Sequence, residues 1–185
     1  MRALVGNGVA AQPAAAGRQI AWGAKVSPEF KAKVVAISAA LGVNPSYLMA
    51  CMAFESGQTF SADVKNGKGS GAVGLIQFMP STAAGLGTTT SALAAMTPEQ
   101  QLDYVKKYFM PFQGRLHTLL DVYMAIFTPA GIGKPGDYVL YSEGKKAYTQ
   151  NKGFDSNNDG KITIEEISTT VQRAYQKGLS PTNMG

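Results

Sequence analysis

The chain has 185 residues, a formal net charge of +5 and a hydrophobic content of 45%. These values exclude a disordered chain and fit one globular domain, expected to be a monomer. The single cysteine, Cys51, excludes an internal disulfide, and no apolar run is long enough to span a membrane. Lysine and arginine form no basic cluster, so nucleic acid is not the expected partner. The positive charge fits either attraction to an anionic polymer or an ordinary solvated surface.

Residues 1–26 are small, rich in Gly and Ala and unpatterned, which predicts a flexible N-terminal arm with Trp22 as a candidate anchor. Residues 3–16 do not make a convincing signal peptide, because Gly, Asn and Pro interrupt the apolar stretch. We expect the main domain over 27–150, and residues 151–185 as an appended loop and helix packed on the same domain.

Capping signals predict helices along the main domain. Ser27-Pro28 and Asn44-Pro45 are starts, and Gly42 and Gly57 are the matching stops. Evidence for strands is thin, so the predicted fold class is mostly α. The other expected elements are a loop with short turns over 85–96, and helices from Thr97-Pro98, over 114–127, over 137–150 and over 165–177.

Glu55 lies in the last turn of the second predicted helix, after an apolar run. Leu48, Cys51, Met52 and Glu55 share one helix face at offsets of three, four and seven. Desolvation and the negative end of the helix dipole both raise the pKa of such a carboxyl group. An acid that stays protonated near neutral pH is what general acid catalysis requires. A solvent-exposed Glu at a frayed helix end is the alternative.

Gln77 is an isolated amide in the otherwise apolar segment 74–82, which follows a polar, Gly-rich loop over 57–73. A side-chain amide donates and accepts hydrogen bonds at once, which suits a sugar hydroxyl or an N-acetyl group. Gln77 is therefore a candidate substrate ligand.

Residues 155–166 match the EF-hand calcium loop at every defining position. Such a loop places side-chain oxygens at positions 1, 3 and 5, a glycine (Gly160) at position 6, a backbone carbonyl at position 7 and a bidentate Glu at position 12. With one loop only, a structural calcium clip is expected rather than a sensor; the alternative is a metal-free, Asx-rich turn. The predicted metal ligands are Asp155, Asn157, Asp159, Lys161 through its carbonyl, and Glu166.

Two central stretches, Glu55-Ser56 and the segment from Gly74 to Thr82, resemble the soluble lytic transglycosylase domain of the lysozyme superfamily. That family has a Glu-Ser pair at a helix end, followed by Gly-Leu-Met-Gln-(apolar)-Met-Pro-x-Thr. The resemblance covers roughly residues 28–141. It implies a lysozyme-like helical fold with a long cleft, and peptidoglycan glycan strands as the substrate at the bacterial cell wall, reached from the periplasm, a phage particle or a lysis system.

The resemblance also implies roles for individual residues. Glu55 would protonate the oxygen between N-acetylmuramic acid and N-acetylglucosamine, then act as base on the muramic C6 hydroxyl to close a 1,6-anhydro ring. Ser56 would position substrate or Glu55, and Gln77 with Phe78 would bind sugar. The family also has an Ala-Tyr-Asn-Ala-Gly segment whose Asn contacts substrate. Residues 126–131 stand in its place here and differ from it in sequence, with Thr128 at the Asn position. Tyr138, before Val139, would contact the N-acetyl group or Glu55.

Two other functions remain open at this stage. A muramidase, similar to goose-type lysozyme, would need a second carboxylate about 6.5–9.5 Å from the acid to hold a water if it inverts, with Asp63 or Asp137 as the candidate. A non-catalytic, calcium-stabilised wall-binding or virion module would need no acid at all.

Overall fold

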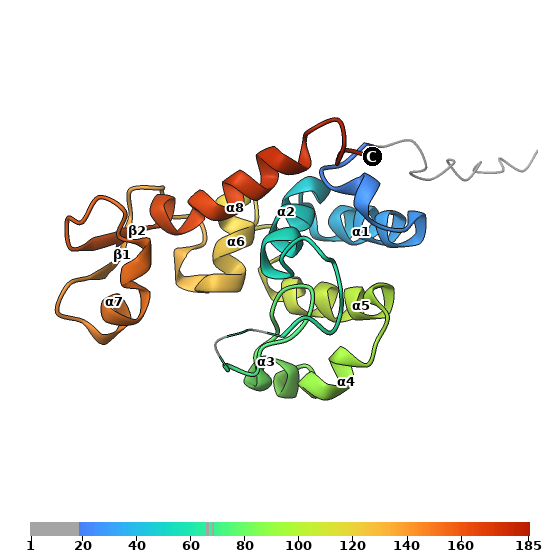
Figure 1. Cartoon of the computed structure of the whole chain (residues 1–185), viewed down its shortest axis with the longest axis horizontal. Helices are drawn as coiled ribbons and strands as arrows, with labels where there is room; N and C mark the ends of the chain where they lie inside the picture. Colours follow the sequence, from blue (N-terminus) through green and yellow to red (C-terminus); the bar gives the residue numbers. More distant parts are fainter. Residues whose placement is uncertain (1–18, 66, 68) are drawn as a thin grey trace, which may run out of the picture.

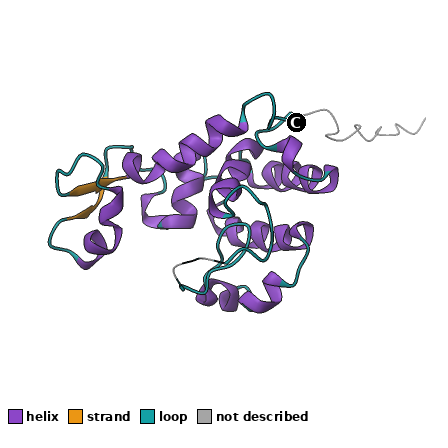
Figure 2. Cartoon of the chain, in the orientation of Figure 1, coloured by secondary structure: helices purple, strands orange, loops and turns teal. Residues whose placement is uncertain are grey.

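The computed structural model describes residues 19–65, 67 and 69–185 and is mostly helical (Figures 1 and 2), as predicted. The described residues form eight α-helices, four short 3-10 helices and one two-stranded sheet. The elements are η1 (Gly23–Lys25), α1 (Pro28–Leu41), α2 (Pro45–Glu55), α3 (Pro80–Gly85), α4 (Thr90–Ala94), α5 (Pro98–Phe109), η2 (Met110–Phe112), α6 (Leu119–Phe127), η3 (Pro129–Gly131), β1 (Val139–Ser142), α7 (Lys146–Asn151), η4 (Lys152–Phe154), β2 (Lys161–Thr163) and α8 (Ile164–Gly178).

The first two helices begin and end where their capping residues predict. The Ser27 hydroxyl accepts a hydrogen bond from the N–H of Phe30, and the Asn44 side chain accepts one from Ser46. Gly42 ends α1 with a φ of 71°, a left-handed conformation that favours glycine. These local signals fix both ends of α1 and the start of α2.

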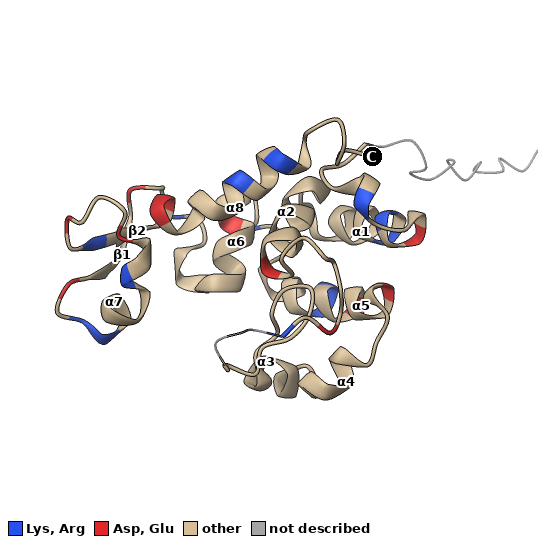
Figure 3. Cartoon of the chain, in the orientation of Figure 1, with Lys and Arg blue, Asp and Glu red and all other residues tan. Residues whose placement is uncertain are grey.

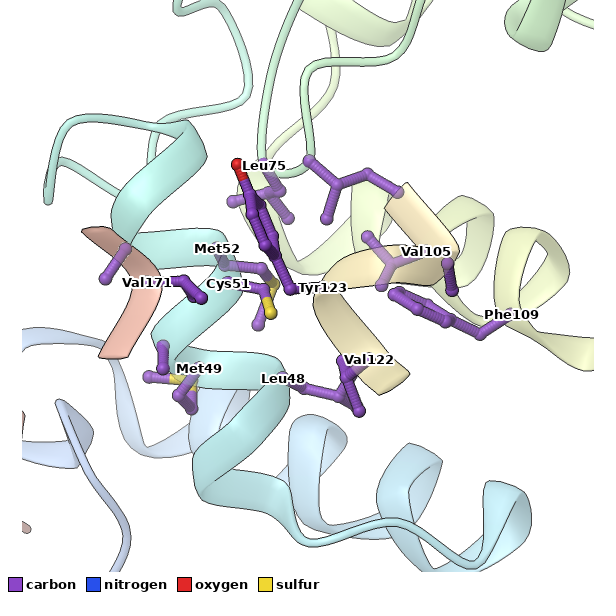
Figure 4. Packing of buried hydrophobic residues seen from close by; sticks show 14 of the residues in the cluster. Leu48, Met49, Cys51, Met52, Leu75, Val105, Phe109, Val122, Tyr123 and Val171 are labelled. Carbon is purple, nitrogen blue, oxygen red and sulfur yellow. The ribbon is translucent and has the colours of Figure 1, made fainter. Parts of the chain in front are cut away.

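Helix α2 lies at the centre of the hydrophobic core. It packs against α1, α6 and α8, and every residue from Leu48 to Ala53 is buried. Figure 4 shows its side chains meeting Val122 and Tyr123 of α6 and Val171 of α8. An element enclosed on several sides can carry an ionisable group at its end into a partly desolvated position.

The expected flexible arm is wrong for residues 19–26, but the expected anchor, Trp22, is confirmed; residues 1–18 lie outside the described part of the chain. Ile20, Ala21 and Trp22 are buried, and the Trp22 indole N–H donates to the carbonyl of Ala174 at 2.9 Å. The N–H of Ile20 also donates to the carbonyl of Gly185. The packed domain therefore begins ahead of the predicted boundary at residue 27, because this segment covers α8.

Three other local predictions need correction. Helix α6 begins at Leu119 rather than 114, because Thr118 and Asp121 form a capping box there. Residues 139–142 are strand β1 instead of helix, and β1 pairs antiparallel with β2, with Val139 opposite Thr163. The stretch 85–96, expected to be a loop with turns, contains the short helix α4.

A buried amide, Gln101 of α5, holds the loop that precedes α3. Its Oε1 accepts the N–H of Leu75 at 2.7 Å, and its Nε2 donates to the carbonyls of Ala62 at 3.0 Å and Leu93 at 2.9 Å. A Cβ at Gly74 would lie 2.2 Å from that Oε1, so only glycine fits there. One side chain thus joins the 57–78 loop, α4 and α5.

No single helix in the described part of the chain is long and apolar enough to cross a membrane. Helices α1 and α2 reach that length and composition only together, and they meet at a bend of 119°.

Replacing Gln101 tests this arrangement. Gln101→Ala removes three hydrogen bonds and leaves the N–H of Leu75 buried without a partner, so we expect the free energy of unfolding to fall by about 3 kcal/mol. Urea denaturation, with circular dichroism as the readout, measures this change. Gln100→Ala, which removes only half of the exposed capping box of α5, is the matched control and should cost about 1 kcal/mol. Equal losses in the two variants would contradict the role given to Gln101.

Candidate active site

Glu55 is the last residue of α2 and is half-buried. Burial raises the pKa of its carboxyl group to about 7. Burial also raises the pKa of Tyr108 and of Tyr123, and the negative charge of Glu55 adds to the rise in both. Glu55 therefore lies near one tyrosine from α5 and one from α6, in surroundings that keep a substantial fraction of it protonated at neutral pH.

Neither tyrosine is among the site residues predicted from the sequence. Tyr123 belongs to the apolar stripe of α6, and its ring packs edge-on against Phe54 at 5.6 Å between centroids. Figure 4 shows its hydroxyl directed to the side of the core where Leu75 lies. Tyr108 donates its hydroxyl to the carbonyl of Ala125 at 2.7 Å. The only available signal was a hydroxyl group on an otherwise apolar helix face.

Glu55 is the only acid of this site among the described residues. Burial alone accounts for its raised pKa, with no contribution from another carboxylate. Asp63 is exposed and accepts a hydrogen bond from the Ser61 hydroxyl, and Asp137 is also exposed. Neither candidate second carboxylate is held in a buried position beside Glu55.

Ser56 does not face a substrate, contrary to one of its two expected roles. Its side chain is buried, its hydroxyl donates to the carbonyl of Met52 at 2.6 Å, and the same oxygen accepts the N–H of Phe60 at 3.0 Å. Ser56 therefore fixes the turn that follows Glu55.

Gln77 is placed close to the surface by its own loop. It has a φ of 52°, and its Nε2 donates to the carbonyls of Val64 and Gly74, both at 3.1 Å. These bonds leave its Oε1 free of any partner in the described residues. Gln77 also lines a small cavity of about 40 Å³ with Tyr108 and Ile126. Tyr108 thus connects Gln77 to the surroundings of Glu55.

The other three predicted substrate ligands have different positions. Phe78 is only 1% exposed and packs edge-on against Tyr108, so its side chain supports the site from behind and the expectation that it contacts sugar is wrong. Thr128 is half-buried at the end of α6. Tyr138 is 42% exposed, its ring lies 5.3 Å from the Lys134 amine, and its backbone hydrogen bonds go to Pro135 and Ile164.

Hydrogen bonds within the predicted calcium loop join its beginning to its middle and to its end. Asp155 is buried, and its carboxylate accepts the N–H groups of Asp159 and Gly160 and the hydroxyl of Tyr148. These bonds, first that from Tyr148, hold the pKa of Asp155 below its usual range. Glu166 accepts the N–H of Ser156 at 3.2 Å, so the twelfth position of the loop lies beside the second.

The types of donor and the closure of this loop fit a calcium ion. Its carboxylates are nevertheless directed to backbone amides: Glu166 also accepts the N–H of Thr163 in the capping box of α8. Within the described residues, no three His, Cys, Asp or Glu side chains are gathered closely enough to hold a metal ion by themselves.

A mostly helical domain with one half-buried acid at the end of its central helix is lysozyme-like. The profile of the family described as Transglycosylase SLT domain matches residues 34–150, which is more than half of the chain. The chain therefore belongs to this family, whose members are peptidoglycan lytic transglycosylases, and it is an enzyme of that class. A search of curated proteins found no match.

The raised pKa of Glu55 predicts a dependence of stability on pH. Because the folded protein binds this proton more tightly than the unfolded chain, the Glu55 contribution to stability is lost as the pH rises from about 4.5 to about 7. Glu55→Gln removes this loss, so the variant should gain stability relative to the parent by up to about 3 kcal/mol between pH 4 and pH 8. Urea unfolding of both proteins at the two pH values measures the difference. A constant difference would show that Glu55 titrates normally.

Proposed function

We propose that the protein cleaves the linkage between N-acetylmuramic acid and N-acetylglucosamine in peptidoglycan as a lytic transglycosylase, with Glu55 as both general acid and general base. The observation that carries this proposal is the position of Glu55 as a lone, half-buried acid beside Tyr108 and Tyr123. Membership of the family supports peptidoglycan as the substrate and the bacterial cell wall as the place of action.

A carboxyl group with a pKa of about 7 suits both steps of this reaction. In its protonated form, Glu55 donates its proton to the glycosidic oxygen as the bond breaks. The resulting carboxylate then accepts the proton of the muramic C6 hydroxyl, whose oxygen attacks C1 of the same sugar. The 1,6-anhydro ring closes and Glu55 is protonated again, so the cycle needs neither a second acid nor a bound water.

Gln77 and Thr128 are the proposed sugar ligands. The free Oε1 of Gln77 can accept from a sugar hydroxyl, while its Nε2 stays bonded to the loop. Thr128 presents a hydroxyl at the end of α6. Tyr138 has no support from its contacts and is left out of the proposed site.

Replacing Glu55 and analysing the products together test the mechanism. Glu55→Gln keeps the shape of the side chain and removes its proton, so fragment release from purified peptidoglycan should fall at least about 100-fold. Mass spectrometry of the parent's products should find 1,6-anhydromuramic ends.

Asp63→Asn is the matched control and should retain both the rate and the anhydro ends. Reducing ends from the parent, with activity lost in Asp63→Asn, would instead identify an inverting muramidase. Undiminished fragment release by Glu55→Gln would rule out Glu55 as the acid.

We also propose that loop 155–166 binds calcium as a structural clip. The ligands would be the side chains of Asp155, Asn157, Asp159 and Glu166 and the carbonyl of Lys161. An ion there would neutralise the carboxylates of a loop that lies directly ahead of α8, the helix that packs against α2. Two observations support the proposal: the oxygen donors of the loop are those that calcium prefers, and the hydrogen bond between Ser156 and Glu166 joins the two ends of the loop.

Thermal melting tests the clip. Millimolar calcium should raise the Tm of the parent relative to a chelator, because an ion bound only by the folded state stabilises it. Asp155→Ala with Glu166→Ala should remove this difference, while Asp137→Ala, an exposed acid outside the loop, should keep it. Identical melting of the parent in calcium and in chelator would contradict a calcium site.

A further inference from the structure

A groove of about 260 Å³ lies between the end of α2 and the side of α8. Phe54, Gly57 and Gln58 line it on the α2 side, and Arg173 and Lys177 on the α8 side. Two alanines, Ala53 and Ala174, complete a surface that is mainly apolar between the two cations. We call it the α2–α8 groove.

The two cations of the α2–α8 groove have no acidic partner in the described part of the chain, where Lys33 and Asp103 form the one ion pair. Arg173 and Lys177 are both exposed, and their spacing of four residues places them on one face of α8. Figure 3 shows these two basic positions in the C-terminal half of that helix. The groove thus has an uncompensated positive rim.

The amine of Lys177 is already held in place. It donates to the Gln58 Oε1 at 2.6 Å and lies 5.7 Å from the centre of the Trp22 ring. A preorganised amine loses little freedom when it binds an anion. Arg173, which has no side-chain hydrogen bond within the described residues, keeps its planar fork free for a carboxylate.

The groove adjoins the proposed catalytic acid along the chain. Phe54 and Gly57 flank Glu55 and Ser56, and Phe54 packs against Tyr123, whose pKa the charge of Glu55 helps to raise. The α2 wall of the groove therefore runs to the residue before Glu55 and resumes two residues after it.

We propose that the α2–α8 groove binds the acidic peptide stem attached to the muramic acid residue at which the glycan is cut. This proposal rests on the proposed function. Peptidoglycan stems are short peptides with free carboxylates and alanine methyl groups. The carboxylates match Arg173 and Lys177, and the methyl groups match the apolar walls. An extended stem of four residues spans about 13 Å, more than the roughly 8–10 Å that usually separates the axes of packed helices such as α2 and α8.

The experiment compares two substrates from one preparation: intact peptidoglycan, and glycan strands from which an amidase has removed the stems. The quantity measured is kcat/KM for fragment release on each, and their ratio gives the preference for stems. Because a charge-assisted hydrogen bond contributes enough for about a tenfold effect, Arg173→Ala should lower this preference roughly tenfold. Arg173→Lys, which keeps the charge but loses the planar fork, should retain only part of it.

Arg115→Ala is the matched control, since it removes an exposed arginine that lies outside the groove. Its preference for stems should equal that of the parent. An unchanged preference in Arg173→Ala would overturn the proposal, whether kcat/KM stays the same on both substrates or falls equally on both. If the parent released no fragments from either substrate, the proposed function itself would fail.

Discussion

The partial burial of one carboxyl group at the end of α2 is the constraint on which the rest of the structure depends. Desolvation of Glu55 opposes its ionised form, so the surrounding helices must be stable enough to hold it there. The enclosed position of α2 against α1, α6 and α8 supplies that stability. The turn after Glu55 is fixed separately, by the two hydrogen bonds of the Ser56 hydroxyl.

The opposite wall of the site is a loop, and polar side chains give it a fixed shape. Gln101 fastens this loop to α4 and α5 from within, and Gln77 closes it near the surface. A loop without regular structure needs such bonds, because buried backbone groups without partners are costly. Both glutamines therefore serve the site through the backbone, and the free oxygen of Gln77 remains for a ligand.

Elements with strong local signals could be predicted from the sequence, and contacts between distant segments could not. The caps Ser27, Asn44 and Thr97 mark their helices correctly because a cap depends on residues within one turn. The sequence predicts Trp22 as an anchor but not its partner, because Ala174 is 152 residues away.

Strand β1 was missed for the same reason, since its partner β2 lies inside the predicted calcium loop. The residues of the candidate site divide in the same way, into those with a local signal and those brought in by distant contacts. Glu55 and Gln77 could be found as polar residues in apolar segments, whereas Tyr108 and Tyr123 come to the site only when α5 and α6 pack beside α2.

The α2–α8 groove and the single acid both depend on how the muramic acid is oriented in the site. A transglycosylase relies on a hydroxyl of the muramic acid itself as the nucleophile, so the orientation of that sugar decides whether the ring can close. Stems are attached only to muramic acid, so a groove that holds the stem selects this sugar for the position beside Glu55. Contacts remote from the reacting atoms can supply this orientation, and the entropy they remove before the reaction no longer opposes it. A site with one carboxylate would then direct the attack through the placement of its substrate.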